Sequence, residues 1–416
     1  MIRKIRQLSK KLSYPRTQLS KNEISQNSLR VCSVYYQIFS ALLYREAKAL
    51  TNEGISVDII CYHTNKAGKN LRSYEGINIY PIQSRSSREA SNVLYLLRLI
   101  QFFLKSFLFL SYSGLFRRYK IIHFTTPPDF LVFAAIIPKL FGAKIIMDIH
   151  DIGPEFYMRR LGVGEDHLVV MIIKFIEKLA TRFSDHVIAV TDLWRDRLIS
   201  RSTLSSKCTT LLNVPDDRLF RNISKNNYRN KSHNFNLFYH GSLEELFGVD
   251  TLIFAMPTIA KNIKNVKLHI YGSGRLLNKY KKLIDKFGIN ESVSFHNSVP
   301  FDELPQILAQ ADIGIVPTKG SVFSGEILAM KSLEYISLGI PIVISKTKGH
   351  SYYYDASMVK FFKPGNKDDL AKAVIELYSN EAEIKMIRSH SQTFIEKYGW
   401  QNSRKTYINI VHDLTC

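Results

Sequence analysis

Hydrophobic positions in the first half of the chain form short continuous runs that alternate with longer stretches of helical spacing. The runs are rich in β-branched and aromatic residues, which is typical of buried strands. Continuous apolar strands separated by helices predict a parallel sheet that is covered by helices on both faces. The predicted strands are 30–36, 56–64, 76–82, 119–128, 144–151, 186–191 and 207–217.

The second half repeats this alternation after a polar, basic stretch at 218–234. A chain of 416 residues is too long for one compact core, so two domains are expected. We predict an α/β protein in which two doubly wound, Rossmann-like domains face each other across a cleft and bind ligands at the carboxyl ends of their strands. The predicted strands of this half are 235–242, 267–274, 292–300, 311–318 and 340–346.

These patterns divide the chain into five parts. We expect two terminal helices with a break near Tyr398–Trp400, and we expect them to cross back to the N-terminal domain. The parts are a basic arm (1–29), an N-terminal Rossmann-like domain (30–217), a linker (218–234), a C-terminal Rossmann-like domain (235–385) and the terminal helices (386–416).

One long hydrophobic stretch, residues 93–116, has enough apolar side chains to suggest a membrane span. Arg98, Gln101 and Lys105 interrupt it at helical spacing, and each would be costly at the centre of a bilayer. We therefore favour an amphipathic helix packed on the sheet. A helix that lies in a membrane interface is the alternative.

The charge balance favours an anionic partner. The chain has 57 Lys and Arg against 36 Asp and Glu, a formal net charge of +21. A phosphorylated small molecule or an anionic membrane surface fits this charge, whereas no sequence signature of nucleic-acid binding is present, so we expect no nucleic acid. The four cysteines are scattered, which favours a reducing, cytoplasmic compartment, with possible contact at the inner face of the membrane.

The segment 324–345 carries two glutamates, Glu326 and Glu334, eight positions apart. Its pattern predicts a helix that begins near Ser324 and ends at Gly339, a residue type suited to the left-handed helix cap. On such a helix the two carboxylates lie about 12 Å apart along the axis and about 80° apart around it. The amides of the first turn favour an anion. Glutamates at these positions are also common on ordinary solvated helices, so the spacing alone leaves both interpretations open.

The residues around this pair resemble a known family. The string GEILAMKSLEYISLGIPIVIS, at 325–345, resembles the E-x7-E motif of family 4 retaining glycosyltransferases, which have the GT-B fold of two Rossmann-like domains. Further similar strings follow in the expected order over about residues 30–410. They lie at 43–62, 148–157, 176–192, 211–220, 238–256, 269–274, 293–317 and 398–400.

The resemblance implies a role for each matching residue. In it, Glu334 holds the ribose hydroxyls of a nucleotide-sugar and Glu326 contacts the transferred sugar. His150 lies beside the sugar and the acceptor, although a strand-end histidine with a structural hydrogen bond is the alternative. The implied catalytic residues are His150, Glu326 and Lys331, and the implied acceptor-binding residues are Asp151 and Glu155. The implied donor-binding residues are Gly241, Ser242, Tyr271, Gly272, Arg275, His296, Ser298, Ile327, Leu328 and Glu334.

Two departures from the family pattern concern the leaving diphosphate. Relatives carry an Arg and then a Lys after the glycine of the C-terminal loop, where this chain has Ser242 and Phe247. Both cations would neutralise charge that builds up in the transition state. Lys331 is the first substitute to consider, with Lys319 and Arg275 as weaker ones. The chain also has no Asp-x-Asp triplet, so we expect neither a metal nor another cofactor.

These observations lead to a hypothesis about function. The resemblance implies a retaining glycosyltransferase that moves a sugar from a nucleotide-sugar to a saccharide or lipid-linked saccharide in polysaccharide or glycolipid biosynthesis. Because the two cations are missing, a second hypothesis is a catalytically weak relative that binds a nucleotide-sugar or acts in an assembly. A third is a sugar epimerase with the GT-B fold.

Overall fold

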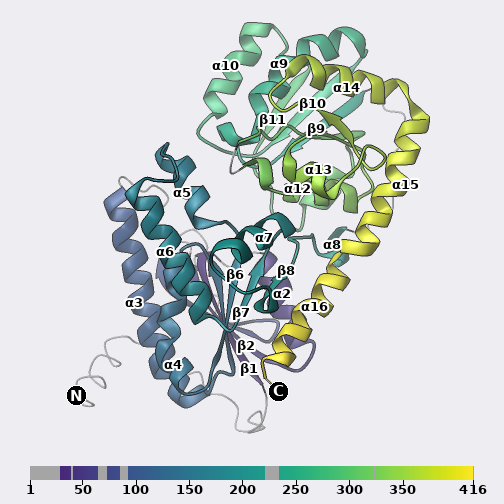
Figure 1. The fold of residues 1–416 in the computed structure, drawn as a ribbon. Coiled ribbons are helices and arrows are strands. Elements are labelled where there is room, and N and C mark those ends of the chain that lie inside the picture. The colour runs from purple at the N-terminus through teal and green to yellow at the C-terminus, as the bar shows by residue number, and fades with distance from the viewer. Residues whose placement is uncertain are drawn as a thin grey trace.

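The computed structural model describes residues 29–38, 41–63, 73–84, 92–220, 234–321 and 324–415. Almost all of the predicted arm (1–29) and most of the predicted linker (218–234) lie outside the described residues. Two sheets, each flanked by helices, form the two halves of the molecule (Figure 1). This arrangement confirms the predicted α/β architecture of two doubly wound domains.

The N-terminal sheet has the strand order β3-β4-β2-β1-β5-β6-β7-β8, and all its pairs are parallel except the short pair β3–β4. Its strands are β1 (Arg30–Ile38), β2 (Ser56–His63), β3 (Ser73–Tyr74), β4 (Ile77–Ser84), β5 (Ile121–Thr126), β6 (Lys144–Ile149), β7 (His186–Ala189) and β8 (Cys208–Thr210). Its helices are α2 (Ala41–Thr51), α3 (Asn92–Arg117), α4 (Ile136–Leu140), α5 (Gly153–Leu161), α6 (Leu168–Phe183), α7 (Asp192–Arg201) and α8 (Asp217–Phe220), with 3-10 turns η2 (Asp129–Ala135) and η3 (Ser205–Lys207).

The C-terminal sheet has the order β11-β10-β9-β12-β13-β14, and all its pairs are parallel. Its strands are β9 (Phe235–His240), β10 (Val266–Tyr271), β11 (Val293–His296), β12 (Ile313–Val316), β13 (Ile342–Ser345) and β14 (Lys360–Phe362). Its helices are α9 (Val249–Asn262), α10 (Leu277–Phe287), α11 (Leu304–Leu308), α12 (Met330–Ser337), α13 (Lys348–Tyr353) and α14 (Lys367–Ser379), with 3-10 turns η5 (Glu245–Phe247) and η6 (Ser324–Glu326).

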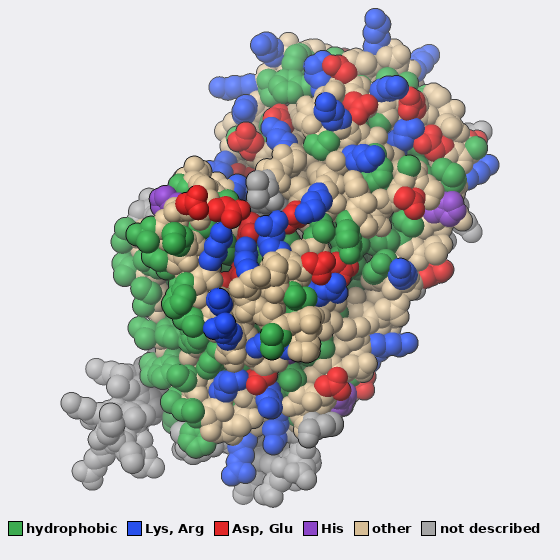
Figure 2. Space-filling view, viewed as in Figure 1, with side chains coloured by type: hydrophobic (Ala, Val, Ile, Leu, Met, Phe, Trp, Pro, Cys, Tyr) green, Lys and Arg blue, Asp and Glu red, His purple; other side chains and the backbone are tan. Residues whose placement is uncertain are grey.

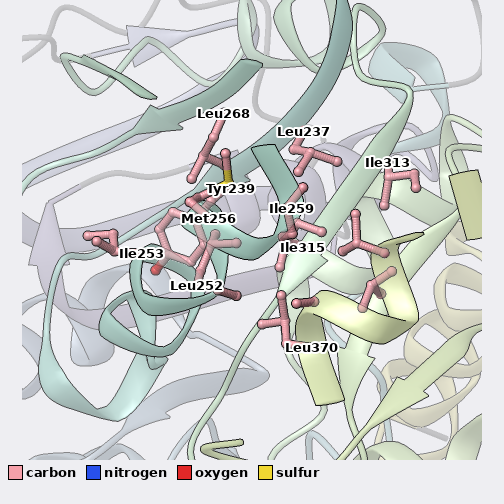
Figure 3. Packing of buried hydrophobic residues seen from close by; sticks show 14 of the residues in the cluster. Leu237, Tyr239, Leu252, Ile253, Met256, Ile259, Leu268, Ile313, Ile315 and Leu370 are labelled. Atoms are coloured by element: carbon pink, nitrogen blue, oxygen red, sulfur yellow. The ribbon is translucent and has the colours of Figure 1, made fainter. Parts of the chain in front are cut away.

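The core of the C-terminal domain forms between β9, β10 and β12 and the helices that cover them (Figure 3). Leu237 and Tyr239 of β9 pack with Leu252 and Met256 of α9, and all four side chains are fully buried. Burial of one such side chain stabilises the fold by about 1.5–3 kcal/mol. This packing fixes the end of β9, from which the loop of Gly241 begins.

The last two helices connect the domains. Helix α15 (Glu381–Tyr398) begins before residue 386, and α16 (Trp400–Asp413) follows it after Gly399. Helix α16 lies against α2 of the N-terminal domain (Figure 1). The hydroxyl of Tyr407 in α16 also lies 2.8 Å from Nδ1 of His123 in β5. The guanidinium group of Arg45 lies 4.1 Å from the ring centre of buried Trp400 at the start of α16.

Helix α3 has one buried face and one exposed apolar face. Phe102, Phe109 and Leu110 pack into the N-terminal core, as expected for a helix that covers the sheet. The other face is hydrophobic as well, and Figure 2 shows apolar side chains gathered over α3 and α6. Among the described residues, Val93–Ser113 is the one stretch that is long and apolar enough to cross a membrane, judged by length and composition alone.

Candidate active site

The loop that carries Glu326 differs from the prediction. The expected single helix from Ser324 to Gly339 is wrong, because only a 3-10 turn (Ser324–Glu326) forms before helix α12 begins at Met330. Tertiary contacts explain the difference: Ile327 packs against the N-terminal core, and the Gly349 backbone lies so close that an added Cβ would be 2.6 Å from Ile327 O. The predicted exit is confirmed, since Gly339 has a φ of 61°.

Glu326 is held by cations from both domains. Arg197 of α7 donates to its carboxylate through Nη2 at 2.7 and 2.8 Å and through Nε at 3.2 Å. Lys348 of α13 donates at 2.7 Å. Burial raises the pKa of Glu326, but the hydrogen bonds of Lys348 and Arg197 outweigh it and the pKa is lowered overall. The predicted sugar contact is therefore a charged carboxylate that already has partners.

Glu334 lies on the buried side of α12 and forms part of a different cluster. Its Oε2 is 2.5 Å from His240 Nε2, and His240 Nδ1 is 3.0 Å from the Tyr335 hydroxyl. Tyr335 in turn donates to the carbonyl of Phe238 at 2.9 Å. His240 is the last residue of β9, directly before Gly241. Sequence reasoning missed His240, although its place at a strand end beside the glycine loop was a usable signal.

The glycine loops after β9 and β10 approach each other at backbone distance. Gly241 N–H donates to Tyr271 O at 2.9 Å, and Leu243 N–H donates to Ser273 O at 2.9 Å. A Cβ on Gly272, whose φ is 154°, would come within 1.9 Å of Gly241 O. This contact explains why glycine is required at 272.

Aromatic rings border these loops. Tyr271 and His296 stack with centroids 4.2 Å apart and an interplanar angle of 13°. Phe238 and Tyr271 also stack, with ring centroids 5.7 Å apart. Ser298 is exposed, and its hydroxyl lies 3.3 Å from that of Ser273. Three of the implied donor-binding residues, Tyr271, His296 and Ser298, thus lie near one edge of the C-terminal sheet.

Lys331 lies next to the glycine loop in an aromatic environment. Its Nζ is 4.2 Å from the ring centre of Tyr239 and 4.6 Å from that of Phe247, and it donates to the Tyr239 hydroxyl at 3.1 Å. An added Cβ on Gly241 would be 3.1 Å from Nζ. Burial lowers the pKa of Lys331 to about 7, although Glu334 raises it. Among the described carboxylates, none forms an ion pair with this ammonium group.

The other residues considered as cations lie elsewhere. Arg275 is 88% exposed in its side chain and pairs with Glu244 at 2.7 Å on the surface. Lys319 pairs with Asp250 at 2.6 Å. Ser242 is exposed, and its carbonyl accepts a hydrogen bond from Tyr239. Phe247, which replaces the expected lysine, instead supplies a ring to Lys331.

On the N-terminal side, His150 belongs to a buried polar cluster. Its Nε2 is 2.8 Å from Asp148 Oδ2, and the same oxygen is 3.4 Å from His123 Nε2. Burial lowers the pKa of His150, but the charge and hydrogen bond of Asp148 outweigh it and raise the pKa overall. Burial also raises the pKa of Asp151 to about 6. Glu46, His123 and Asp148 offer ligand atoms within 4.8 Å of one another, so these are the residues that could hold a metal ion.

Glu155, predicted to bind an acceptor, forms ion pairs within the protein. Its two oxygens accept from Arg201 at 2.6 and 3.0 Å, and Arg197 adds a contact at 3.3 Å. The side chain is 4% exposed. Glu155 is thereby connected to Glu326 through Arg197, a link between the domains that the sequence did not indicate.

Both domains thus present polar groups at the carboxyl ends of parallel strands, with His150 on one side and Lys331 and Glu334 on the other. This fold and this arrangement define the GT-B class of glycosyltransferases. The sequence model of "Glycosyltransferase Family 4" matches residues 40–216, and that of "Glycosyl transferases group 1" matches residues 220–394. The chain belongs to glycosyltransferase family 4.

Solved structures show the same fold over nearly the whole chain. Sucrose-phosphate synthase from Thermosynechococcus elongatus has a TM-score of 0.72 at 14% identity and covers 93% of this chain and 99% of its own. The Anabaena protein HepE in complex with UDP has a TM-score of 0.71 at 16% identity and covers 92% and 100%. At these identities the likeness shows the fold alone.

Curated relatives match over shorter stretches. A GDP-mannose-dependent alpha-(1-6)-phosphatidylinositol monomannoside mannosyltransferase of Mycobacterium tuberculosis is 32% identical over 133 residues, 31% of this chain and 34% of the relative. An uncharacterized glycosyltransferase of Methanocaldococcus jannaschii is 28% identical over 177 residues, 42% of this chain and 44% of the relative. The chain therefore spans about a third to less than half of the length of these relatives.

Proposed function

We propose that this protein is a retaining glycosyltransferase that moves a sugar from a nucleotide-sugar to a saccharide or lipid-linked saccharide. The observation that carries the proposal is the position of Lys331. Burial of a cation in an aromatic site costs free energy, and Lys331 lies beside the glycine loop without a carboxylate partner among the described residues. Such perturbed groups are typical of functional sites. A diphosphate above Gly241 would supply the missing negative charge.

The remaining donor contacts follow from the same geometry. The Glu334 carboxylate accepts from His240, and its lone pairs on the other oxygen suit the ribose hydroxyls of a nucleotide. The stacked rings of Tyr271 and His296 offer an aromatic border for the base. The amide of Leu328 has no hydrogen-bond acceptor among the described residues, which leaves it available to a phosphate oxygen.

The proposed reaction proceeds on one face of the sugar. The bond between the anomeric carbon and the diphosphate oxygen breaks, the acceptor hydroxyl oxygen bonds to the same face of that carbon, and its proton passes to the leaving diphosphate. Lys331 stabilises the charge that builds up on the diphosphate. His150, held by Asp148, lies on the N-terminal side where the sugar and the acceptor would meet. Side chains supply the charge in this scheme, so we propose that neither a metal nor another cofactor takes part.

The apolar face of α3 and α6 supports a lipid-linked acceptor at the inner, cytoplasmic surface of a membrane. Both helices contact η2, and Figure 2 shows apolar side chains gathered over both of them. Arg160 of α5 lies 4.7 Å from the ring of Tyr95 in α3, which connects this surface to the helix that follows His150. The mycobacterial relative is named for a phosphatidylinositol monomannoside. The exposed apolar residues are Val93, Leu94, Leu96, Leu97, Ile100, Leu104, Leu108, Tyr112, Leu168, Val169, Met171, Ile172, Phe175 and Leu179.

Anionic lipid would add to this apolar contact. Lys174, Lys178 and Arg182 lie on α6, and each basic residue near an anionic surface contributes about 1 kcal/mol. In flotation experiments we expect the protein to rise with vesicles that contain phosphatidylglycerol. The variant Leu104→Asp should bind them less, whereas Met386→Asp, which alters an exposed apolar residue of α15, should not. Equal binding of both variants would contradict the membrane contact.

A thermal-shift panel of nucleotide-sugars tests the donor. A ligand that binds only the folded state raises the melting temperature. At a hundredfold excess over its Kd it stabilises the folded state by about 2.7 kcal/mol. We expect at least one of GDP-mannose and UDP-glucose to raise it, and the Lys331→Met variant to lose the response. Binding without any turnover would favour the catalytically weak relative, and release of an altered nucleotide-sugar without an acceptor would favour an epimerase. A response by no nucleotide would contradict the proposal.

A further inference from the structure

A row of six charged side chains with alternating sign crosses from one domain to the other. Each neighbour in the row is connected by an ion pair of 2.6 to 3.3 Å. Four members come from helices α5, α6 and α7 of the N-terminal domain, and two come from the 3-10 turn η6 and helix α13 of the C-terminal domain. The row consists of Lys348, Glu326, Arg197, Glu155, Arg201 and Glu177.

The N-terminal part of this row is firmly anchored. The side chains of Glu155 and Glu177 are 4% and 1% exposed, and Arg201 bonds to both. Burial lowers the pKa of Arg201, but the hydrogen bonds to Glu155 and Glu177 outweigh it and raise the pKa overall. The Ser202 hydroxyl donates to Glu177 at 2.7 Å. Arg197 therefore projects from a rigid base toward the other domain.

The step from Arg197 to Glu326 is the one within the row that crosses the domain boundary. It is a multiple contact, with Nε and Nη2 of Arg197 reaching both carboxylate oxygens. A second contact of α7 lies nearby, where the Tyr353 hydroxyl donates to Asp192 Oδ2 at 3.0 Å. Helix α7 thus touches the C-terminal domain at two points. Arg197 contacts the charged side chain of Glu326, and Asp192 contacts the uncharged side chain of Tyr353.

The carboxylate of Glu326 has no free acceptor site in this state. An ionised carboxylate has about four lone-pair sites. Oε1 accepts from Arg197 Nη2 and from Lys348, and Oε2 accepts from Arg197 Nε and the same Nη2, so each oxygen already has two contacts. A sugar hydroxyl can reach Glu326 only if one of these cations moves away.

We propose that Arg197 is a positioning residue of the donor site, which acts across the domain boundary through Glu326 and which the donor sugar must displace. This inference rests on the proposed function for the identity of the ligand. Without a donor, the contact of Arg197 with Glu326 holds the domains together and orients the loop 324–329. When the sugar hydroxyls take over the Glu326 oxygens, Arg197 keeps its contact with Glu155. Donor binding and domain contact are thereby linked.

The first experiment needs no donor and tests the contact itself. Hydrogen exchange is measured on the full chain and on the variants Arg197→Ala and Arg404→Ala. Arg404 is a matched control because it is 31% exposed, against 28% for Arg197, and its ion pair with Glu53 does not involve the C-terminal loops. We expect exchange in the segments 192–201 and 324–330 to become about threefold faster or more in Arg197→Ala, and to stay unchanged in Arg404→Ala. Unchanged exchange in Arg197→Ala would overturn the inference.

The second experiment uses GDP-mannose and UDP-glucose as probes. Because Arg197→Ala frees the Glu326 oxygens, we expect its donor KM to fall about three- to tenfold. The kcat should change by less than about twofold, because Arg197 has already left Glu326 when the donor is bound. Arg197→Lys keeps the charge but offers a single contact point. Its donor KM should lie between those of the unmodified protein and of Arg197→Ala. A rise in KM with unchanged kcat would overturn the inference, since Arg197 would then bind the donor directly.

The two proposals fail in different ways. If neither probe binds the unmodified protein, the proposed function loses its support, while the exchange experiment still decides whether Arg197 holds Glu326. If the probes bind and are turned over but exchange does not respond to Arg197→Ala, the function stands and the positioning role is wrong.

Discussion

The buried ammonium group of Lys331 leads to a prediction that joins stability to function. Lys331 is 8% exposed, and burial lowers the pKa of its amine from the ordinary value of 10.5 to about 7. The substitution Lys331→Met keeps an unbranched side chain of similar size and removes the charge. We expect the ligand-free protein to become more stable and to lose donor binding.

The magnitude follows from the lowered pKa of Lys331. A pKa lowered from 10.5 to about 7 corresponds to a cost of about 5 kcal/mol for the charged form. This cost is already net of the contacts of the charged amine with the rings of Tyr239 and Phe247. At pH 6 the variant should therefore be more stable by about 5 kcal/mol.

The lowered pKa of Lys331 determines how the stability of the folded state changes with pH. Below pH 7 the amine is charged in the folded and unfolded states, so the full cost is present. Between about pH 7 and 10.5 the folded state releases the proton while the unfolded state keeps it, so the stability contributed by this group rises with pH. The advantage of Lys331→Met should shrink above pH 7, to about 2 kcal/mol at pH 9, and vanish above about pH 10.5.

Scanning calorimetry at pH 6 and pH 9 is the assay, because it separates the transitions of a two-domain protein. A gain of about 5 kcal/mol raises the melting temperature of a domain of this size by about 10–20 °C. Lys319→Met is the control, because Lys319 is 31% exposed and paired with Asp250, so its removal should not stabilise the fold. Destabilisation by Lys331→Met at pH 6, or a gain equal at both pH values, would refute the reasoning.

Two further substitutions have clear expectations. Glu334→Gln weakens a buried contact to His240 and the proposed ribose site, so donor titrations should give a Kd about tenfold higher with little change in melting temperature; an unchanged Kd would contradict the ribose role. Gly272→Ala places a Cβ 1.9 Å from Gly241 O, so calorimetry should show a loss of more than about 2 kcal/mol. Gly164→Ala, with nothing within 4 Å, should be nearly neutral, and equal losses in both variants would speak against the close approach.

The sheet architecture was predictable because local patterns determine it. Runs such as 145–149 and 342–345 are continuously buried, and their largely apolar composition is visible in the sequence. Strand β14 was missed, since its three residues, Lys360–Phe362, give no period to recognise. The segment 129–135 has a helical pattern but forms a 3-10 turn, a distinction that hydrophobic spacing does not encode.

The candidate site was only partly predictable, because several contacts depend on distant segments. The position of Lys331 beside Gly241 follows from the packing of α12 on the sheet, which the family resemblance anticipated. The state of Glu326 does not follow, since Arg197 lies 129 positions away in the other domain. The helix start at Met330 instead of Ser324 has the same cause, because Ile327 packs on the N-terminal core. Contacts between domains leave no periodic signal in either segment.

The most direct test of the central claim is the release of nucleoside diphosphate with transfer of the sugar. The protein and the Lys331→Met variant are incubated with GDP-mannose or UDP-glucose and a lipid-linked saccharide acceptor fraction, and the product linkage is determined by NMR. The account predicts acceptor-dependent release by the unmodified protein, retention of the anomeric configuration, and a loss of at least about a hundredfold in the variant. Equal release by both proteins, or a product with inverted configuration, would contradict it.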